Sequence, residues 1–440
     1  MTTARESETL TRVGPGTTMG NLMRHYWLPA LKSEELKADG DPVRFRVLCE
    51  DLIAFRDTQG RVGVMDHRCP HRCASLFFGR NEEGGIRCVY HGWKFDVDGN
   101  CLDMANVPPH QDFKHKIHAK AYKATERNGI VWIYMGEAEK APPLPMLESH
   151  LLAEDEVTVT FAQRDCNYLQ ALEGDIDTSH FSFLHAGAVK LDDLAEDDLG
   201  RFQIMNKTPE FISDETPWGT MYAAHRPADA GKRYWRIAHF LFPCFTMQPN
   251  GAFSHLIGCR AWVPIDDTHC MFVQVNWTGI KRGLSVKKNG DPIGGGALAM
   301  RYLPNTTDWL GRWRITQNMG NDYEIDRDAQ RRNTIYTGIT GIHTQDQCVT
   351  ESMGPIVDHT FERLAPSDLM ITQTRRRLLV AAQALASHGT LPPGIEDPSI
   401  YLGARSGHFV CDAKTEWHDA YTEQLRQSAN PTGHLLQAAE

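Results

Sequence analysis

The sequence lacks the long apolar runs that membrane and export segments need. No stretch of its 440 residues approaches eighteen uninterrupted apolar residues, and the first twenty residues contain no apolar segment of the signal-peptide kind. We therefore expect neither a membrane span nor an export signal. The eleven cysteines are too sparse for a secreted disulfide scaffold, so a reducing compartment, the cytoplasm, is the predicted location.

An excess of positive charge is also missing. Lys and Arg number 46 against 56 Asp and Glu, which gives a formal net charge of −10. A surface that binds phosphate backbones needs the opposite balance, so we expect no nucleic-acid partner. The length exceeds what one ordinary core supports and predicts two domains, one small and one large.

Two short segments each pair a cysteine with a histidine. Cys69 precedes His71, Cys88 precedes His91, and sixteen residues separate the two segments. A structural zinc site usually takes both cysteines from one segment and both histidines from another, so zinc fits poorly. In a Rieske [2Fe–2S] cluster, two thiolates bind one iron and two imidazoles bind the other. The split pairs therefore predict a Rieske cluster.

Chance pairing is the alternative, because the chain has many histidines and because buried cysteine often serves as a small apolar residue. Two pairs in the right order, the second followed by Gly92 and Trp93, make chance a poor explanation. We expect His67 and Cys73 to pack near the ligands. A disulfide between Cys73 and Cys101 is conceivable, but the spacing does not support it.

Strand patterns surround the two pairs and indicate a small β domain. A short helix is expected at 17–27, and strands are expected at 44–55, 62–65, 93–97 and 129–135. The proline-rich segment 141–145 favours an extended linker. We therefore divide the chain into residues 1–140 and residues 141–440.

The second domain mixes strands with helices. Strands are expected at 234–242 and 271–277, and a helix is expected from Pro366 to His388, ended by Gly389. The basic run 375–377 inside this helix predicts a solvated or interface face. The glycine-rich stretch 290–296 lacks the strand and helix context of a phosphate loop and is expected to be a mobile loop.

A second group of candidate ligands consists of Asp177, His180 and His185. On an ideal helix the two histidines would point about 140° apart, so both reach one metal only if the helix bends or breaks. Gly187 and the segment 181–183 permit a break. Two imidazoles with one carboxylate form the facial triad of non-haem Fe(II) oxygenases. A structural role for the histidines is the alternative, and the preceding Rieske pattern favours the metal site.

Taken together, the two patterns resemble the oxygenase α subunits of the Rieske non-haem iron aromatic-ring hydroxylases. The likeness is greatest to the phthalate 4,5-dioxygenase group, which includes aryl-ether O-demethylases, and it covers nearly the whole chain. Four segments carry it most clearly: 14–31, 77–101, 321–331 and 345–358. The resemblance implies an α+β protein in which an all-β Rieske domain precedes a helix-grip catalytic domain with an antiparallel sheet, assembled as a homotrimer or as a hexamer of stacked trimers.

The resemblance also implies roles for individual residues. The four cluster ligands would be Cys69, His71, Cys88 and His91. His180, His185 and Asp346 would bind a mononuclear iron, with Asp358 and then Asp322 as the less favoured third ligand. Asp177 would link the cluster of one subunit to the iron of its neighbour. One departure is Gly174, which stands where many members of the family carry Asn.

The activity implied is that of the terminal oxygenase of a multicomponent system. Electrons from NAD(P)H would arrive through a separate flavin and iron–sulfur reductase, because the chain has no flavin or dinucleotide fingerprint of its own. O2 would be activated at the mononuclear Fe(II), either to dihydroxylate an aromatic carboxylic acid or to O-demethylate a methoxylated one, in aromatic compound catabolism.

Arg236, on the expected strand 234–242, is a candidate partner for the substrate carboxylate, with an ordinary ion pair as its alternative. The alternative function is a Rieske electron carrier or binding protein without oxygenase activity. Such a protein would need neither the histidines of the second site nor its carboxylates.

Overall fold

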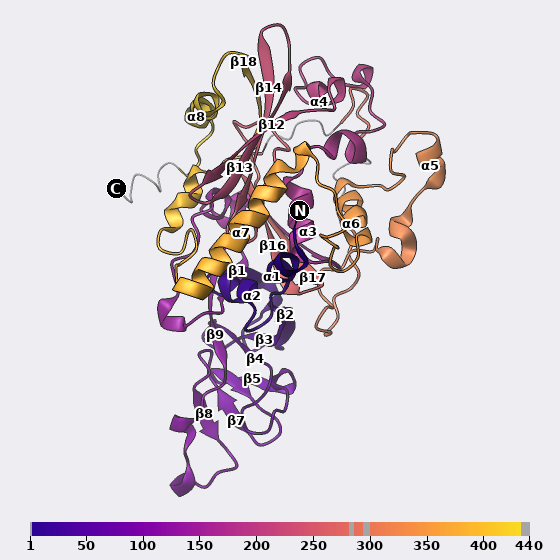
Figure 1. Ribbon diagram of the computed structural model, residues 1–440. Coiled ribbons are helices and arrows are strands. Elements are labelled where there is room, and N and C mark those ends of the chain that lie inside the picture. The colour runs from indigo at the N-terminus through magenta and orange to yellow at the C-terminus, as the bar shows by residue number, and fades with distance from the viewer. Residues whose placement is uncertain (1, 281–285, 294–299, 433–440) are drawn as a thin grey trace.

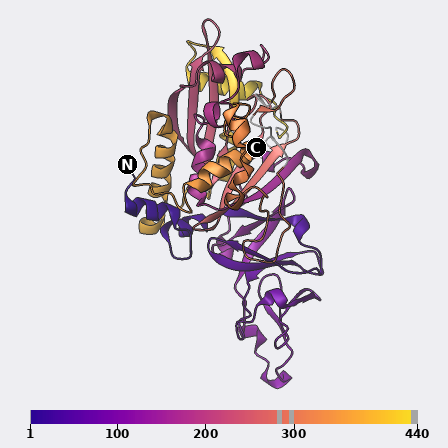
Figure 2. The same ribbon diagram turned by 90° about the vertical axis from the view of Figure 1, so that its right-hand side faces the viewer.

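The computed structural model describes residues 2–280, 286–293 and 300–432. Within this part of the chain the strands form three antiparallel sheets of six, four and eight strands. Figures 1 and 2 show an elongated molecule with the four-stranded sheet at one end and the eight-stranded sheet toward the other. The six-stranded sheet lies between them.

The six-stranded sheet has the order β1-β10-β9-β4-β3-β2. Its strands are β1 (Trp27–Lys32), β2 (Val43–Val47), β3 (Glu50–Arg56), β4 (Val62–Asp66), β9 (Ala121–Arg127) and β10 (Ile130–Tyr134). The four-stranded sheet is inserted between β4 and β9 and consists of β5 (Arg80–Glu82), β6 (Gly85–Arg87), β7 (Trp93–Phe95) and β8 (Cys101–Met104). A small core that includes Ile53, Phe95 and both Cys69 and Cys88 lies at this end.

Two predictions for this part were wrong in detail. The strand expected at 44–55 is two strands, because the chain turns at Leu48 and Cys49, whose φ angles are 47° and 62°. Their backbone N–H groups donate to the carbonyl oxygens of Pro264 and Ile265, at 3.0 Å each, so a distant segment stabilises the turn. The helix expected at 17–27 is shorter and ends at Met23. The next residues enter β1, an edge strand, where proline is tolerated.

The eight-stranded sheet has the order β11-β17-β16-β15-β14-β13-β12, with β18 paired to β14. Its strands are β11 (Val157–Arg164), β12 (Glu210–Thr216), β13 (Gly219–Pro227), β14 (Lys232–Leu241), β15 (Phe245–Met247), β16 (Gly258–Asp266), β17 (His269–Trp277) and β18 (Gly407–Asp412). The strands predicted at 234–242 and 271–277 correspond to β14 and β17.

The described residues form eight α-helices, several of which pack on this sheet. They are α1 (Ala4–Thr11), α2 (Thr18–Met23), α3 (Tyr168–Ile176), α4 (Arg201–Met205), α5 (Arg327–Arg331), α6 (Ile342–Ser352), α7 (Leu369–His388) and α8 (Trp417–Gln427). The longest, α7, packs against β12 and β13, and the N-terminal helices α1 and α2 pack against α7 (Figure 2). None of the described helices combines the length and the apolar composition needed to cross a bilayer.

The predicted helix near residue 366 is confirmed as α7, and Gly389 ends it in the left-handed conformation, at φ 67°. The prediction for its basic run was wrong at Arg375. This side chain is only 4% exposed and forms a bidentate ion pair with Glu173 of α3, at 2.5 and 2.7 Å, and a further pair with Glu362. The periodicity of α7 gave no sign of these distant carboxylates. The loop expected at 290–296 lies partly outside the described residues.

The largest core joins the N-terminal and C-terminal parts. It contains Phe45 and Trp132 from the six-stranded sheet, Phe161 and Val263 from the eight-stranded sheet, and Leu378 from α7. The segment 141–147 connects the two sheets without regular secondary structure. The division at residue 140 stays a prediction.

Candidate metal centres

The two cysteine–histidine segments form loops of the same construction. In each, the backbone N–H four residues after the cysteine donates to the cysteine carbonyl: Cys73 to Cys69 and Gly92 to Cys88, both at 2.9 Å. Both closing residues are left-handed, with φ angles of 59° and 78°. The loops therefore turn sharply in the same way and present their cysteines and histidines side by side.

The side chains of these loops fit a Rieske cluster. The thiols of Cys69 and Cys88 are buried, at 1% and 3% exposure, while both histidines are partly exposed. The rings of His71 and His91 lie 4.5 Å apart, and His71 stacks on Trp93 at 4.4 Å with 9° between the planes. An inner pair of sulfur donors and an outer pair of nitrogen donors is the set that this cluster requires. All eleven cysteines, including Cys73 and Cys101, are free of disulfides.

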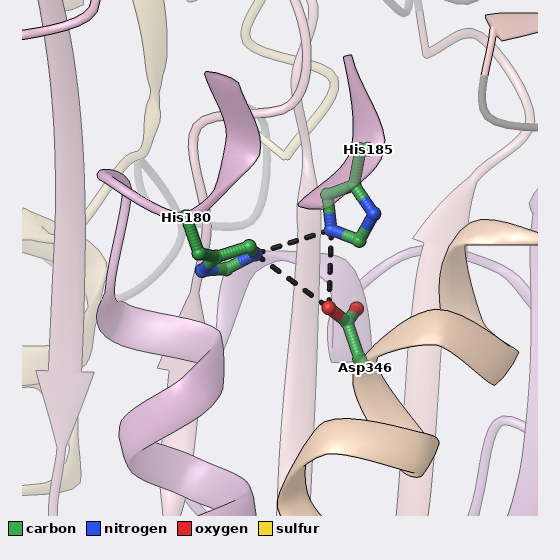
Figure 3. A group of neighbouring side chains, drawn as sticks. All are labelled: His180, His185 and Asp346. Carbon is green, nitrogen blue, oxygen red and sulfur yellow. Dashed lines mark hydrogen bonds and ion pairs between the residues drawn. The ribbon is translucent and has the colours of Figure 1, made fainter. Parts of the chain in front are cut away.

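The second site brings together His180, His185 and Asp346 (Figure 3). Nε2 of His185 lies 3.1 Å from Nε2 of His180 and 3.0 Å from Oδ1 of Asp346, and the remaining edge of the triangle, from His180 to Asp346, is 3.5 Å. Ligands 2.1 Å from a metal and 90° apart are separated by about 3 Å. The three donor atoms therefore have the spacing of one face of a six-coordinate metal.

The chain reaches this geometry by breaking the helix. The helix α3 ends at Ile176, and Asp177 is extended, with φ −83° and ψ 114°. The segment Phe181–His185 is a π-helical turn in which the N–H of Ala186 donates to the carbonyl of Phe181, at 3.0 Å. Residues five apart lie close to one another in such a turn, which places both imidazoles on one side.

The other ring nitrogen of each histidine faces a polar side chain. Nδ1 of His185 lies 2.7 Å from Oε1 of Gln345, and Nε2 of that amide donates to the carbonyl of Ile339 at 2.7 Å. The amide oxygen must then accept from His185 Nδ1, which leaves the lone pair of Nε2 directed at the other two donors. Nδ1 of His180 lies 3.4 Å from Oδ2 of Asp177. Sequence reasoning did not assign a role to Gln345, and its only signal was its place beside Asp346.

The charges within the group favour a bound cation. Burial opposes the charged form of Asp346, but His185 and His180 together hold the pKa of this carboxyl below its ordinary value. Burial also opposes a charge on His180, yet Asp177 and Asp346 raise the pKa of this imidazole overall. Both shifts show surroundings that stabilise positive charge at this site, and its oxygen and nitrogen donors are those of a divalent metal site.

The two less favoured candidates for the third iron ligand are not part of this group of donor atoms. Asp358 and Asp322 are exposed, and Asp358 accepts hydrogen bonds from its own loop, from the N–H of Thr360 at 2.9 Å. At Gly174, where the resemblance anticipates Asn, an added Cβ would lie 3.2 Å from Cγ2 of Thr350. A side chain here would press on Thr350 of α6, and Gly174 itself lines the cavity described next.

A cavity of about 710 Å³ opens beside the three donor atoms. Phe181 and Phe272 contribute apolar walls, and Arg236, Arg260 and Arg301 contribute cations. Of these arginines, Arg260 is paired with Asp175 and Arg301 with Glu324.

Arg236 differs from the other two. It is 4% exposed, its Nε donates to Oγ1 of Thr178 at 2.7 Å, and no carboxylate in the described part of the chain lies at ion-pair distance from it. The ion-pair alternative for Arg236 is therefore not observed. Arg236 is therefore a buried cation of the cavity lining for which no ion pair is seen within the described ranges.

Comparison with known families finds two matching domains. Residues 26–119 match the family described as Rieske [2Fe-2S] domain, and residues 133–434 match the family described as LigXa C-terminal domain like. The second match alone covers more than half of the chain.

Two relatives show the same family, and one solved structure shows a similar fold. The chain is 49% identical to the 3-chlorobenzoate-3,4-dioxygenase oxygenase subunit of Comamonas testosteroni, over 97% of this chain and 99% of that one. It is 35% identical to the phthalate 4,5-dioxygenase oxygenase subunit of Pseudomonas putida, over 95% and 94%. The fold is similar to that of dicamba monooxygenase bound to dicamba, with a TM-score of 0.54 at 17% identity, over 83% and 99%.

These relationships set aside the alternative of an electron carrier without oxygenase activity. The predicted α+β fold and the two cofactors, a [2Fe–2S] cluster and a mononuclear iron, are confirmed. The chain belongs to the Rieske non-haem iron oxygenases and is the oxygenase subunit of an aromatic dioxygenase or monooxygenase system.

Proposed function

We propose that the protein is the terminal oxygenase of a multicomponent system that dihydroxylates a substituted aromatic carboxylic acid. The observation that carries this proposal is the buried cation of Arg236 in the cavity beside the three donor atoms. The printed name of the 49% identical relative, a 3-chlorobenzoate dioxygenase subunit, supports a benzoate-like substrate. Electrons from NAD(P)H would come through a separate reductase.

The metal ligands proposed are the residues of the two sites described above. The cluster would be held by Cys69, His71, Cys88 and His91, and the iron would be held by His180, His185 and Asp346. When bound, these groups supply electron storage and O2 activation. The chain's own contribution is to hold the donors in place, through Gln345 and Asp177, and to orient the substrate.

Arg236 is the proposed anchor for the substrate carboxylate. Its Nε donates to Thr178 and its guanidinium also interacts with the Tyr234 hydroxyl, and the remaining terminal N–H groups are proposed to bind a planar carboxylate. The ring of Phe181 lies 5.3 Å from the guanidinium carbon and lines the same cavity. A carboxylate bound at Arg236 would place its aromatic ring against these apolar walls, and this fixed orientation would determine which ring carbons face the iron.

Asp177 is the proposed link to the cluster of a neighbouring subunit. Its carboxylate lies 3.4 Å from His180 and is 23% exposed, so it contacts the iron site and remains accessible. The loops of the cluster lie at one end of the elongated chain, and the histidine site lies between α3 and α6, well toward the other (Figure 1). We propose that a homotrimer, alone or stacked as a hexamer, brings His91 of one subunit to Asp177 of the next.

Turnover with identified products tests the proposal. Purified oxygenase, a compatible reductase and NADH would be given benzoate, chlorobenzoates, phthalate and methoxybenzoates, with O2 uptake and products measured. A cis-diol from a benzoate is the expected result, and Arg236→Met should raise its KM far more than the control Arg301→Met. Formaldehyde from a methoxybenzoate without any cis-diol would assign O-demethylation instead. No product from any acid would overturn the proposal.

A further inference from the structure

A histidine lies beside Arg236 in the lining of the cavity. His408, on β18, is directly opposite Arg236, on β14, in the ladder between these two strands (Figure 1). The backbone N–H of His408 donates to the carbonyl of Gly251 at 2.9 Å, and its carbonyl accepts from the N–H of Phe253 at 3.0 Å. Because both groups point away from β14, the pair with Arg236 is of the non-hydrogen-bonded kind, in which facing side chains lie closest together. Both side chains line the cavity.

One ring nitrogen of His408 faces a hydroxyl group. Its Nδ1 lies 3.1 Å from Oη of Tyr234, which is buried. The same oxygen accepts from Nε2 of Gln203 at 3.3 Å and interacts with the guanidinium of Arg236, which can only donate. A phenol has one proton, and these two donors leave it for His408. Tyr234 therefore donates to Nδ1 of His408.

This hydrogen bond determines which nitrogen of the imidazole carries the proton. Burial first, and then the charge of Arg236, lower the pKa of His408 to about 3, so the ring is neutral at physiological pH. A neutral imidazole whose Nδ1 accepts a hydrogen bond carries its proton on Nε2. Nε2 of His408 has no hydrogen-bond partner in residues 2–280, 286–293 and 300–432. The ring therefore offers an N–H donor to a ligand in the cavity that it lines.

A second buried histidine has the same tautomer but uses both of its nitrogens. His239, also on β14, is 0% exposed and does not line this cavity. Nε1 of Trp218 donates to its Nδ1 at 3.2 Å, and its Nε2 lies 2.9 Å from the carbonyl oxygen of Arg405. Buried polar groups that serve the fold alone are normally satisfied in this way. The comparison favours a ligand as the partner of His408 Nε2.

Arg236 and His408 together suit a group with two acceptor oxygens. A carboxylate only accepts, so one of its oxygens can bind the guanidinium while the other accepts from the Nε2–H of His408. The amide of the same acid has one oxygen and one NH2 group, so it leaves one of the two donors unsatisfied. A site built to hydrogen-bond both oxygens therefore discriminates strongly against the amide.

We infer that His408 is a substrate-binding residue whose Nε2–H donates to the second oxygen of the carboxylate anchored by Arg236, and that Tyr234 is a positioning residue that fixes the tautomer of His408. The inference rests on the proposed function for the identity of the acid. It adds a neutral donor to the charged anchor, and this donor makes the site selective for an acid over its amide.

Two substitutions at position 408 separate the roles of the two ring nitrogens. In His408→Gln the amide nitrogen can take the place of Nε2, which keeps a donor in the cavity. In His408→Asn the amide reaches only the place of Nδ1, so the partner of Tyr234 is kept and the cavity donor is lost. The Tm of protein loaded with both metals would be measured without O2 over a range of benzoate and benzamide concentrations, which gives a Kd for each ligand.

The two variants should differ for benzoate alone. We expect His408→Asn to weaken benzoate binding about tenfold or more and benzamide binding less than about threefold, because only the carboxylate loses a hydrogen bond. His408→Gln should stay within about threefold of the wild-type Kd for both ligands. His239→Asn is the matched control, and it should lower Tm and leave both Kd values unchanged.

The role of Tyr234 has its own measurement. Tyr234→Phe should weaken benzoate binding about threefold, because the proton of His408 is then free to occupy either nitrogen. Combined with His408→Asn, it should add nothing to the loss of benzoate affinity, since the cavity donor is already absent. Additive losses would show that Tyr234 acts independently of His408 and would overturn its role as a positioning residue.

Two outcomes would overturn the role of His408. One is an unchanged benzoate Kd in His408→Asn, and the other is an equal loss for benzoate and benzamide, which would show a structural residue. If His408→Asn does not fold, His408→Met, which also lacks a donor, is measured in its place.

The outcomes also separate this inference from the proposed function, because binding is measured without turnover. A benzoate Kd that depends on His408, in a protein that oxidises no aromatic acid, would keep the carboxylate site and remove the proposed reaction. Formation of a cis-diol from benzoate with the same KM in wild type and in His408→Asn would keep the reaction and remove the inference.

Discussion

The two metal centres of this chain are built in opposite ways. The cluster loops are two copies of one turn, close in sequence, with their histidines toward solvent at the narrow end of the molecule. The second site joins a π-helical turn to a residue of α6 that is far away along the chain, and its histidines are fixed by Gln345 and Asp177. A local motif therefore specifies the first site, and only the complete fold specifies the second.

The largest effect is expected from removing the proposed third iron ligand, which should disable the mononuclear site and leave the cluster intact. Asp346→Ala should lower turnover at least about a thousandfold, because two imidazoles alone hold a divalent metal weakly. The Rieske absorbance should be unchanged, since no cluster ligand is touched. Iron content, O2 uptake and the visible spectrum measure this.

The matched control for that variant is Asp358→Ala, in an exposed loop. It should leave iron content and turnover at wild-type levels. The reverse pattern, with activity lost in the control and kept in Asp346→Ala, would show that the third ligand is misassigned.

The converse experiment damages the cluster alone. His71→Cys should abolish the Rieske electron paramagnetic resonance signal and shift the potential from above about −150 mV toward the −400 mV of all-cysteine clusters. Iron bound at the second site should stay near one per chain. A variant that kept the Rieske signal would contradict the assignment of His71.

A smaller effect is expected where the two centres are proposed to meet. Asp177→Asn preserves volume and removes the charge beside His180, so reoxidation of the cluster by O2 and substrate should slow about a hundredfold while both metals stay bound. Stopped-flow absorbance of the cluster would measure the rate of this reoxidation.

Mixed assemblies test whether electrons pass between subunits or within one chain. Subunits carrying His71→Cys would be combined with subunits carrying Asp346→Ala. Recovery of activity is expected if electrons cross between subunits, and its absence in verified hybrids would place the route within one chain.

The smallest effect concerns the orientation of a single imidazole. Gln345→Leu should weaken iron binding about 10- to 100-fold, because His185 loses the acceptor that fixes its tautomer. Gln347→Leu, a buried change on the same helix, is the control and should leave iron affinity unchanged. Equal effects from both variants would mean that packing of α6, and not the hydrogen bond, sets the affinity.

The sequence predicted those features whose cause is local. The two cysteine–histidine pairs, the strand β4 and the end of α7 at Gly389 depend on neighbouring residues, and spacing or turn chemistry revealed them. The break between α3 and His185 was also expected, because an unbroken helix would separate the two histidines.

Features that depend on distant partners could not be predicted in this way. The turn at Leu48 interrupts an otherwise continuous strand pattern because a remote segment accepts its N–H. The sequence predicted a solvated or interface position for Arg375, whereas the structure pairs it with Glu173.

The backbone hydrogen bonds from Leu48 and Cys49 to Pro264 and Ile265 also bear on how electrons enter the protein. They connect the six-stranded sheet directly to the strand β16, and the shared core adds to this contact. A movement of the six-stranded sheet relative to β16 would therefore break these bonds and expose apolar surface. In the proposed multicomponent system, the six-stranded sheet stays fixed on the catalytic domain, and a reductase would dock at the partly exposed histidines of the cluster loops.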